Sequence, residues 1–205
     1  YKRQLNVLRL TKRNKIKRTA LVDFAQDGLT KHLLRACKML NKDDELVDVE
    51  ISTGNSDVVV VDVLGHASRF NEGDVPLVST AARGVKAIAS SIEQVPLLTM
   101  VALSSKEVTL LLAVSKKKAA RLINSAKIPT TERLGAKVNL IKVLKKNPYE
   151  LVSVRKAERI RGQVSYASLV TPESNTAMDL ANLQPIDLNS ERRENVPNLG
   201  KTLIR

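Results

Sequence analysis

Three consecutive lysines, Lys116, Lys117 and Lys118, follow Ser115 at the point where apolar spacing predicts that a helix over 116–126 begins. A helix N-terminus carries partial positive charge, so lysines in its first turn oppose the macrodipole and cost about 0.3 to 1 kcal/mol each. A phosphate bound there would meet free backbone N–H groups and the ammonium groups together. The pattern favours a phosphate-binding site, whereas a later helix start would place the lysines in a loop.

A second basic cluster contains Arg155, Lys156, Arg159 and Arg161. Whether this stretch is helical or extended, Arg155 and Arg159 share a face, and their planar guanidinium groups suit phosphate oxygens. Two Phe, three Tyr and no Trp in 205 residues leave few rings for stacking on bases. We therefore expect contacts to a nucleic-acid backbone rather than base reading.

Positive charge is concentrated in two segments of the chain. The net charge is +13, from 34 Lys and Arg against 21 Asp and Glu. Residues 1–18 contain eight basic and no acidic residues, and residues 116–161 contain fourteen basic and three acidic ones. Such segregated charge is typical of proteins that bind polyanions, although a pair of solvated faces could have the same composition. Neither segment has the aromatic face of an interfacial helix, so no membrane partner is expected.

The predicted nucleic-acid contacts are basic residues of these two segments. They are Lys2, Arg3, Arg9, Lys12, Arg13, Lys15, Lys17, Arg18, Lys116, Lys117, Lys118, Arg121, Lys142, Lys145, Lys146, Arg155, Lys156, Arg159 and Arg161. The partner could be DNA or RNA, because backbone contacts do not distinguish them.

Catalytic chemistry finds little support in the sequence. His66 follows a predicted strand beside Ser68 and Arg69, but the sequence offers it no evident partner. Cys37 falls on the apolar stripe of a predicted helix, and a single cysteine cannot form an internal disulfide. No Cys and His cluster fits a zinc site. We therefore predict no catalytic residue, metal or cofactor.

The first half of the chain alternates between helical and strand periodicity. Apolar residues at helical spacing predict helices over 20–40 and 78–92, and a third over 116–126. Alternation over 46–52 and a valine run over 57–64 predict two strands, joined as a hairpin by turn residues.

The second half of the chain contains several segments with strand-like patterns. Residues 97–103 and 107–114 are predicted to form a second hairpin. Residues 136–144 could be a strand or a helix, while 149–154 and 163–170 favour strands. The order of strand, strand and helix occurs twice, but too few residues are identical to indicate a duplication.

These elements predict an α+β fold with two β-hairpins and about three amphipathic helices in one core. Residues 1–18 are predicted to be an extended basic arm, residues 19–170 the globular domain and residues 171–205 an extended C-terminal tail. A polar tail of this composition has few apolar anchors, so neighbouring protein subunits are expected to order it.

The functional prediction is a non-enzymatic structural subunit of a large nucleoprotein assembly, of the virion coat or nucleocapsid type. The expected location is a virion or an intracellular nucleoprotein particle, away from disulfide-forming compartments. A ribosomal-type RNA-binding protein, a nucleic-acid-processing enzyme or accessory factor that uses His66, and a monomeric regulatory DNA-binding protein are the alternatives.

Overall fold

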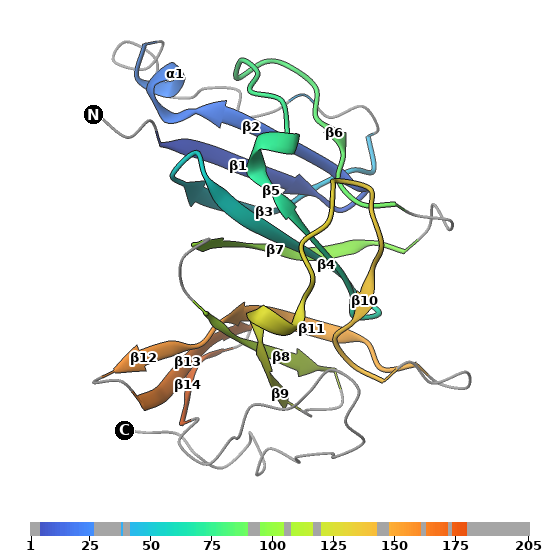
Figure 1. The fold of residues 1–205 in the computed structure, drawn as a ribbon, viewed down its shortest axis with the longest axis vertical. Helices are drawn as coiled ribbons and strands as arrows, with labels where there is room; N and C mark the ends of the chain where they lie inside the picture. Colours follow the sequence, from blue (N-terminus) through green and yellow to red (C-terminus); the bar gives the residue numbers. More distant parts are fainter. Residues whose placement is uncertain are drawn as a thin grey trace.

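Antiparallel β-sheets stacked one upon another make up the protein (Figure 1). The structure is a computed structural model. It describes residues 5–26, 38, 42–89, 95–104, 108–116, 120–142, 148–160, 163–171 and 174–179. We call the first three sheets along the chain blades 1, 2 and 3.

Blade 1 has the strand order β3-β1-β2-β6. Its central hairpin consists of β1 (Asn6–Thr11) and β2 (Lys15–Ala20), and β3 (Leu46–Ser52) pairs with β1. The short strand β6 (Val85–Lys86) closes the other edge by pairing with β2. A one-and-a-half-turn helix, α1 (Leu21–Gln26), continues directly from β2.

Blade 2 repeats this plan with the order β10-β5-β4-β7. The hairpin is β4 (Ser56–Asp62) with β5 (His66–Asn71), β7 (Leu97–Ser104) pairs with β4, and β10 (Val138–Asn139) pairs with β5. Each strand therefore has a counterpart in blade 1.

Blade 3 has the order β11-β8-β9. Its hairpin is β8 (Leu110–Ser115) with β9 (Ala120–Asn124), and β11 (Leu151–Lys156) pairs with β8. A further sheet follows, made of β12 (Glu158–Ile160), β13 (Gln163–Thr171) and β14 (Ser174–Asp179).

The chain moves back and forth between neighbouring blades. After β3 it forms the β4–β5 hairpin of blade 2, returns to blade 1 as β6, and enters blade 2 again as β7. The same path joins blades 2 and 3 through β8, β9, β10 and β11. Blades 1 and 2 are thus each completed by a strand that the chain forms only after starting the next blade.

Two connections make these return passes, and each begins with a 3₁₀ turn. Connection 1 (residues 72–89) starts at η1 (Glu72–Asp74), and connection 2 (residues 125–142) starts at η2 (Ser125–Lys127). The side chains of Asn71 and Asn124 cap the two turns, each accepting one backbone N–H at 2.8 Å.

Apolar side chains fill the spaces between the blades. The core between blades 1 and 2 includes Leu8, Leu10, Ile16, Val58, Val60, Phe70, Val75, Ala87, Ile88, Leu97, Met100 and Ala102. The core between blades 2 and 3 includes Val59, Val61, Ala67, Val101, Leu103, Leu111, Ala113, Ile123, Ile128, Leu140, Leu151 and Val154. Adjacent residues of β4 thus belong to different cores, because successive side chains of a strand point to opposite faces.

The hairpin turns of blades 1 and 2 hold the return strands in place. Gly65 has a φ of 83°, and a Cβ there would lie 2.6 Å from Ile141 Cγ1. In blade 1 the counterpart is Asn14, whose φ is 63° and whose side-chain oxygen accepts the N–H groups of Ala87 and Ile88. Both turns require a left-handed residue beside the returning chain.

The α+β prediction is wrong, and the extended basic arm with it. Residues 6–20 form the central hairpin of blade 1, and Leu8, Leu10 and Ile16 are fully buried. The basic residues of this segment alternate with the apolar ones, so local charge hid a two-residue period. Of the predicted tail, residues 174–179 form β14, and the rest after 179 lies outside the described residues.

The three long helices are corrected as well. α1 ends at Gln26, and most of 27–41 lies outside the described residues. Within 78–92, the described residues up to 89 form an extended connection, and 120–126 are β9 followed by the start of η2. Strands buried on both faces have apolar residues at many spacings, so helical spacing arises there without a helix.

Both predicted hairpins are wrong in their pairing, although their strands exist. β3 pairs with β1, and β4 pairs with β5 and β7. Likewise β7 pairs with β4, and β8 pairs with β9 and β11. A short turn between two strands is compatible with a hairpin or with a step to the next blade, and local sequence does not separate the two.

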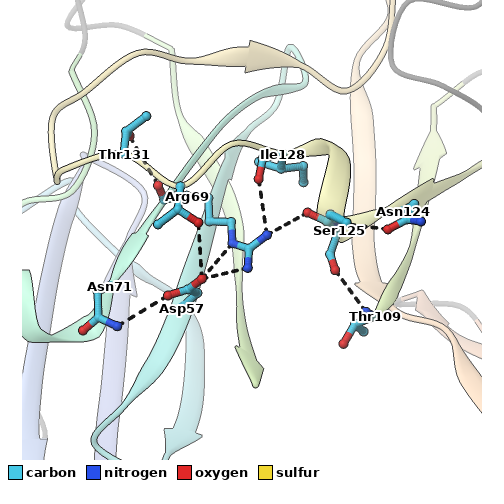
Figure 2. Close-up of polar contacts among 10 residues, drawn as sticks. Asp57, Arg69, Asn71, Thr109, Asn124, Ser125, Ile128 and Thr131 are labelled. Atoms are coloured by element: carbon cyan, nitrogen blue, oxygen red, sulfur yellow. Dashed lines mark hydrogen bonds and ion pairs between the residues drawn. The ribbon is translucent and has the colours of Figure 1, made fainter. Parts of the chain in front are cut away.

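An arginine of blade 2 makes four hydrogen bonds, two within the blade and two to connection 2 (Figure 2). Nε and Nη2 of Arg69 donate to Oδ2 of Asp57 at 2.9 and 2.7 Å, and Nη1 donates to the carbonyls of Ser125 and Ile128 at 2.8 and 3.3 Å. Both side chains are largely buried, at 14% and 10% exposed. The pair therefore fixes connection 2 against blade 2.

We predict that Arg69→Met lowers the free energy of unfolding by about 3 kcal/mol, because it leaves Asp57 as a buried charge without its partner. Urea titration of the full chain measures this loss. The double variant D57N/R69M should recover part of the stability, because no uncompensated charge remains. A loss below about 1 kcal/mol in R69M would contradict the assigned role.

Candidate nucleic-acid interface

The two connections carry much of the exposed positive charge of blades 1 and 2. Connection 1 contains Arg83 and Lys86 against the buried Glu72 and the exposed Asp74, and connection 2 contains four basic residues and one acidic residue. The strands that end these connections, β6 and β10, lie on the same side of the molecule (Figure 1). The connections therefore form one basic margin along the stack of blades.

Three cations on this margin are available to a ligand. Arg83, Lys86 and Lys137 are exposed, and none of them makes an ion pair with the residues that the structure describes. Lys15 of β2 stands directly opposite Lys86 of β6 in the sheet. Like charges facing each other across a sheet edge are unfavourable unless counter-ions or a polyanion neutralise them.

Arg133 ties the two connections together. Its backbone N–H donates to Oδ2 of Asp74 at 3.1 Å, Nε donates to the carbonyl of Asp74 at 3.0 Å, and Nη1 donates to the carbonyl of Lys86. Because these acceptors belong to connection 1, the basic residues of both connections are held at a fixed spacing.

The structure buries two of the residues predicted to contact nucleic acid. Arg9 is 2% exposed, lies 5.1 Å from the centre of the Phe24 ring and donates to Thr19. Lys17 is 3% exposed and donates to the carbonyl of Thr80 at 2.5 Å. Both cations stabilise the blade interior and are not accessible to a phosphate in this structure.

Several other predicted residues are exposed but paired with acids. Lys12 pairs with Glu45, Arg13 with Asp43 at 3.6 Å, Lys116 with Glu150 at 3.3 Å, and Arg155 with Asp48 at 3.0 Å. The predicted helix start at Lys116 is instead the turn between β8 and β9, so no helix N-terminus is present there. A polyanion would have to compete with these carboxylates.

The remaining predicted residues are distributed over several surfaces. Lys142 and Lys156 are exposed, and Lys15 and Arg18 are partly exposed. Arg121 is half-buried and donates to the carbonyl of Leu140 at 3.0 Å, and burial lowers its pKa from the usual value. Arg159 lies on β12. Outside the described residues are Lys2, Arg3, Lys117, Lys118, Lys145, Lys146 and Arg161.

The basic residues of the two connections that the sequence-based contact set leaves out are Arg83, Lys86, Lys127, Arg133 and Lys137. The signal was present, because Pro76 and Pro129 each precede a valine of the return strand, Val85 and Val138, at the same spacing. A repeat recognised from this spacing would have placed the basic residues after each proline on equivalent surfaces.

A cluster of acidic and basic residues joins the edge strands β3, β7 and β11 of the three blades. Asp48 of β3 accepts hydrogen bonds from the hydroxyl of Thr99, from the backbone of Met100 at 3.1 Å, and from Nη1 of Arg155 at 3.0 Å. Glu50, also on β3, has its pKa raised by burial and by the charge of Asp48, while Lys156 and Arg155 oppose that shift. This cluster holds the three blades together through hydrogen bonds and charge pairs between β3, β7 and β11.

His66 has a partner that the sequence did not reveal. Its Nδ1 lies 2.8 Å from Oδ2 of Asp62, and Oδ1 of Asp62 accepts the N–H groups of Leu64 and His66 at 3.0 and 2.9 Å. The pair thus closes the turn between β4 and β5, which accounts for it structurally.

Two further findings apply to the described part of the chain. There, no three His, Cys, Asp or Glu side chains come together as a metal ion would need. No helix in that part has the length and apolar character required to cross a bilayer.

Comparison with curated proteins finds relatives among DNA topoisomerases. The chain is 40% identical over 79 residues to the A subunit of DNA gyrase from Haloquadratum walsbyi, which covers 38% of this chain and 9% of that protein. It is 26% identical over 148 residues to the A subunit of DNA topoisomerase 4 from Bacillus subtilis, covering 72% and 18%. The chain thus spans less than a fifth of the length of these relatives. No protein-family profile matches it.

Solved structures with the same fold come from the same group of proteins. The C-terminal domain of DNA topoisomerase IV aligns with a TM-score of 0.73 and 20% identity, over 91% of this chain and 56% of that one. The DNA gyrase A C-terminal domain aligns with a TM-score of 0.64 and 22% identity, over 76% and 50%. The fold is therefore the β-pinwheel of these domains.

These relatives correct the predicted virion coat or nucleocapsid function, together with the predicted virion location. The matched proteins are DNA gyrase and topoisomerase subunits of cellular organisms. The aliphatic side chains of the chain fill the cores between blades.

We predict that Glu50→Gln raises Tm at neutral pH. Since the folded-state pKa of Glu50 lies above its ordinary value of 4.5, stability is lost as pH rises from that value through the folded-state pKa, and the loss is complete above it. Thermal unfolding at several pH values should show the gain at pH 7 and its disappearance near pH 3, well below the ordinary pKa, where Glu50 is protonated in both states. Glu132→Gln, at an exposed site, serves as the control. A lower Tm of E50Q at pH 7 would show that attraction to Lys156 and Arg155 outweighs burial.

Proposed function

We propose that this chain is a DNA-binding, non-catalytic part of the A subunit of a DNA topoisomerase, and that it binds the duplex backbone through the basic margin of connections 1 and 2. The observation that carries the proposal is the β-pinwheel fold shared over 91% of the chain with a domain of DNA topoisomerase IV. The sequence relatives, which are DNA gyrase and DNA topoisomerase 4 subunits, support the same partner.

The electrostatics of the described surface support this choice of contact site. Arg83, Lys86 and Lys137 are exposed without an ion pair in the described part of the chain, whereas Lys12, Arg13 and Lys116 already face carboxylates. Phosphate contacts release condensed counter-ions from DNA, and cations not already neutralised contribute most to that gain. Contacts of this kind position a duplex without reading its sequence.

A non-catalytic role fits the inventory of side chains. The Asp62–His66 pair is accounted for by the β4–β5 turn, and the matched domains are parts of enzymes whose remaining length lies outside the alignment. The prediction that residues 171–205 contact neighbouring subunits falls largely outside the described residues and stays a prediction.

We predict that the triple variant Arg83→Gln, Lys86→Gln, Lys137→Gln binds duplex DNA more weakly and with a smaller salt dependence. Each lost phosphate contact should reduce the slope of log K against log salt by about 0.9, or about 2.7 for all three. Fluorescence anisotropy with a labelled duplex over a range of salt concentrations measures the slope, and no sequence preference should change.

The matched control removes the same number of charges from paired positions, as Lys12→Gln, Arg13→Gln, Lys116→Gln. Its slope should stay within about one unit of the wild type. The reverse result, with the control losing the slope and the first variant keeping it, would move the interface to Lys12, Arg13 and Lys116, which are among the contacts predicted from sequence. A wild-type chain that does not bind duplex at low salt would refute the proposal.

A further inference from the structure

A leucine occupies an unfavourable backbone conformation at the tip of connection 2. Leu134 is the third residue of a turn closed by a hydrogen bond from Gly135 N–H to the carbonyl of Glu132 at 2.9 Å, and its φ is 73°. Positive φ at this position of a turn favours glycine or asparagine, and a branched aliphatic side chain is rare there. The Leu134 side chain is nevertheless 40% exposed.

The fold of the connections does not require this conformation. Connection 1 has the equivalent turn, closed by Ala82 N–H to the carbonyl of Ser79 at 3.1 Å, with Ala81 in the place of Leu134. Within the described ranges, Asn14 and Leu134 are the non-glycine residues with positive φ, so Ala81 has negative φ. Strain combined with an exposed apolar tip is thus specific to connection 2, and strain of this kind often marks a functional position.

The tip is held by hydrogen bonds of Arg133, and both basic and acidic residues lie near it in the chain. Arg133, the preceding residue, is fixed to Asp74 and to the carbonyl of Lys86. Leu134 thus follows a residue that reaches the backbone of Lys86, and Lys137 comes three residues after it. The exposed carboxylate of Glu132 begins the same turn, and that of Asp74 accepts the N–H of Arg133, so a polyanion would approach from the side of Lys137.

Resting on the proposed function, we propose that Leu134 is a wedge that enters the minor groove and partly unstacks one base-pair step while the neighbouring cations hold the phosphates. Apolar side chains such as leucine, presented between basic residues, separate base steps in this way and kink the duplex. Pyrimidine–purine steps yield most easily, so a TA step is the expected site. Unstacking exposes apolar base faces, against which an exposed leucine gains contacts that water does not offer.

The test is fluorescence of 2-aminopurine, placed at the only TA step of an otherwise GC-rich duplex, on addition of the full chain. Unstacking of the labelled base by the wild type should raise its fluorescence. Leu134→Asn, which suits positive φ, should lose at least about half of that rise while it retains the salt slope, since no charge changes. Its Tm should stay within about 2 °C of the wild type.

Leu77→Asn is the matched control, because Leu77 is an exposed leucine (48%) on connection 1 without positive φ. It should give the wild-type rise. Should L134N fold poorly, with Tm lower by more than about 4 °C, Leu134→Gly, which also suits the backbone, takes its place in the same measurement.

Several outcomes would overturn the wedge. These are duplex binding by the wild type without a rise in fluorescence, an unchanged rise in the Leu134 variants, or an equal loss in L77N. Loss of binding to anionic phospholipid vesicles in L134N, with the DNA signal unchanged, would assign the leucine to a membrane surface. If the wild type fails to bind duplex at all, the proposed function itself fails, which separates the two conclusions.

Discussion

Strand exchange between successive blades is the constraint on which the structure depends. β6 completes blade 1 only after β4 and β5 have formed, and β10 completes blade 2 only after β8 and β9 have formed. Each blade therefore gains its full set of hydrogen bonds only when its neighbour is present. We infer that blades 1 to 3 fold as one cooperative unit, with long-range pairing that makes folding slow.

Each contact between successive blades contains a buried carboxylate that accepts hydrogen bonds. Between blades 2 and 3, Asp57 of a strand supplies the buried carboxylate and Arg69 reaches the carbonyls of the 3₁₀ turn. Between blades 1 and 2 the carboxylate sits on the turn instead. There Glu72, fully buried, accepts hydrogen bonds from Ser52, from the backbone of Ser56 at 2.6 Å and from Asn6 at 3.4 Å.

Each of the two contacts thus contains one buried carboxylate. It lies on a strand in one contact and on the 3₁₀ turn in the other. Asn6 stands at the position equivalent to Asp57, and Ser125 stands at the position equivalent to Glu72. Two acids facing each other at one contact would repel without water to screen them, and no acid would leave buried donors unpaired. Placing one acid at each contact keeps its buried hydrogen-bond donors paired. The different position of the acid also distinguishes successive blades whose apolar faces are similar.

Several strands follow from the local sequence pattern, but their pairing partners do not. The valine run of β4 and the alternation of β3 follow from local pattern, and both strands lie close to the predicted positions. Their pairing depends on segments that return from the next blade, and no local signal encodes that path. Arg9 and Lys17 show the same limit for the predicted interface, because the sequence alone does not distinguish a buried basic residue from an exposed one.

Exposure of connections 1 and 2 is a direct consequence of strand exchange, since a chain that returns to the preceding blade must run over the outside of the stack. This exposed position and the cations of connections 1 and 2 are the reasons for proposing these connections as the DNA contact. Backbone hydrogen exchange of the full chain, with and without a mixed-sequence duplex, tests this most directly. We expect slower exchange in residues 76–89 and 126–142; slower exchange confined to the hairpin turns at 12–14 and 116, or none at all, would contradict this placement of the DNA.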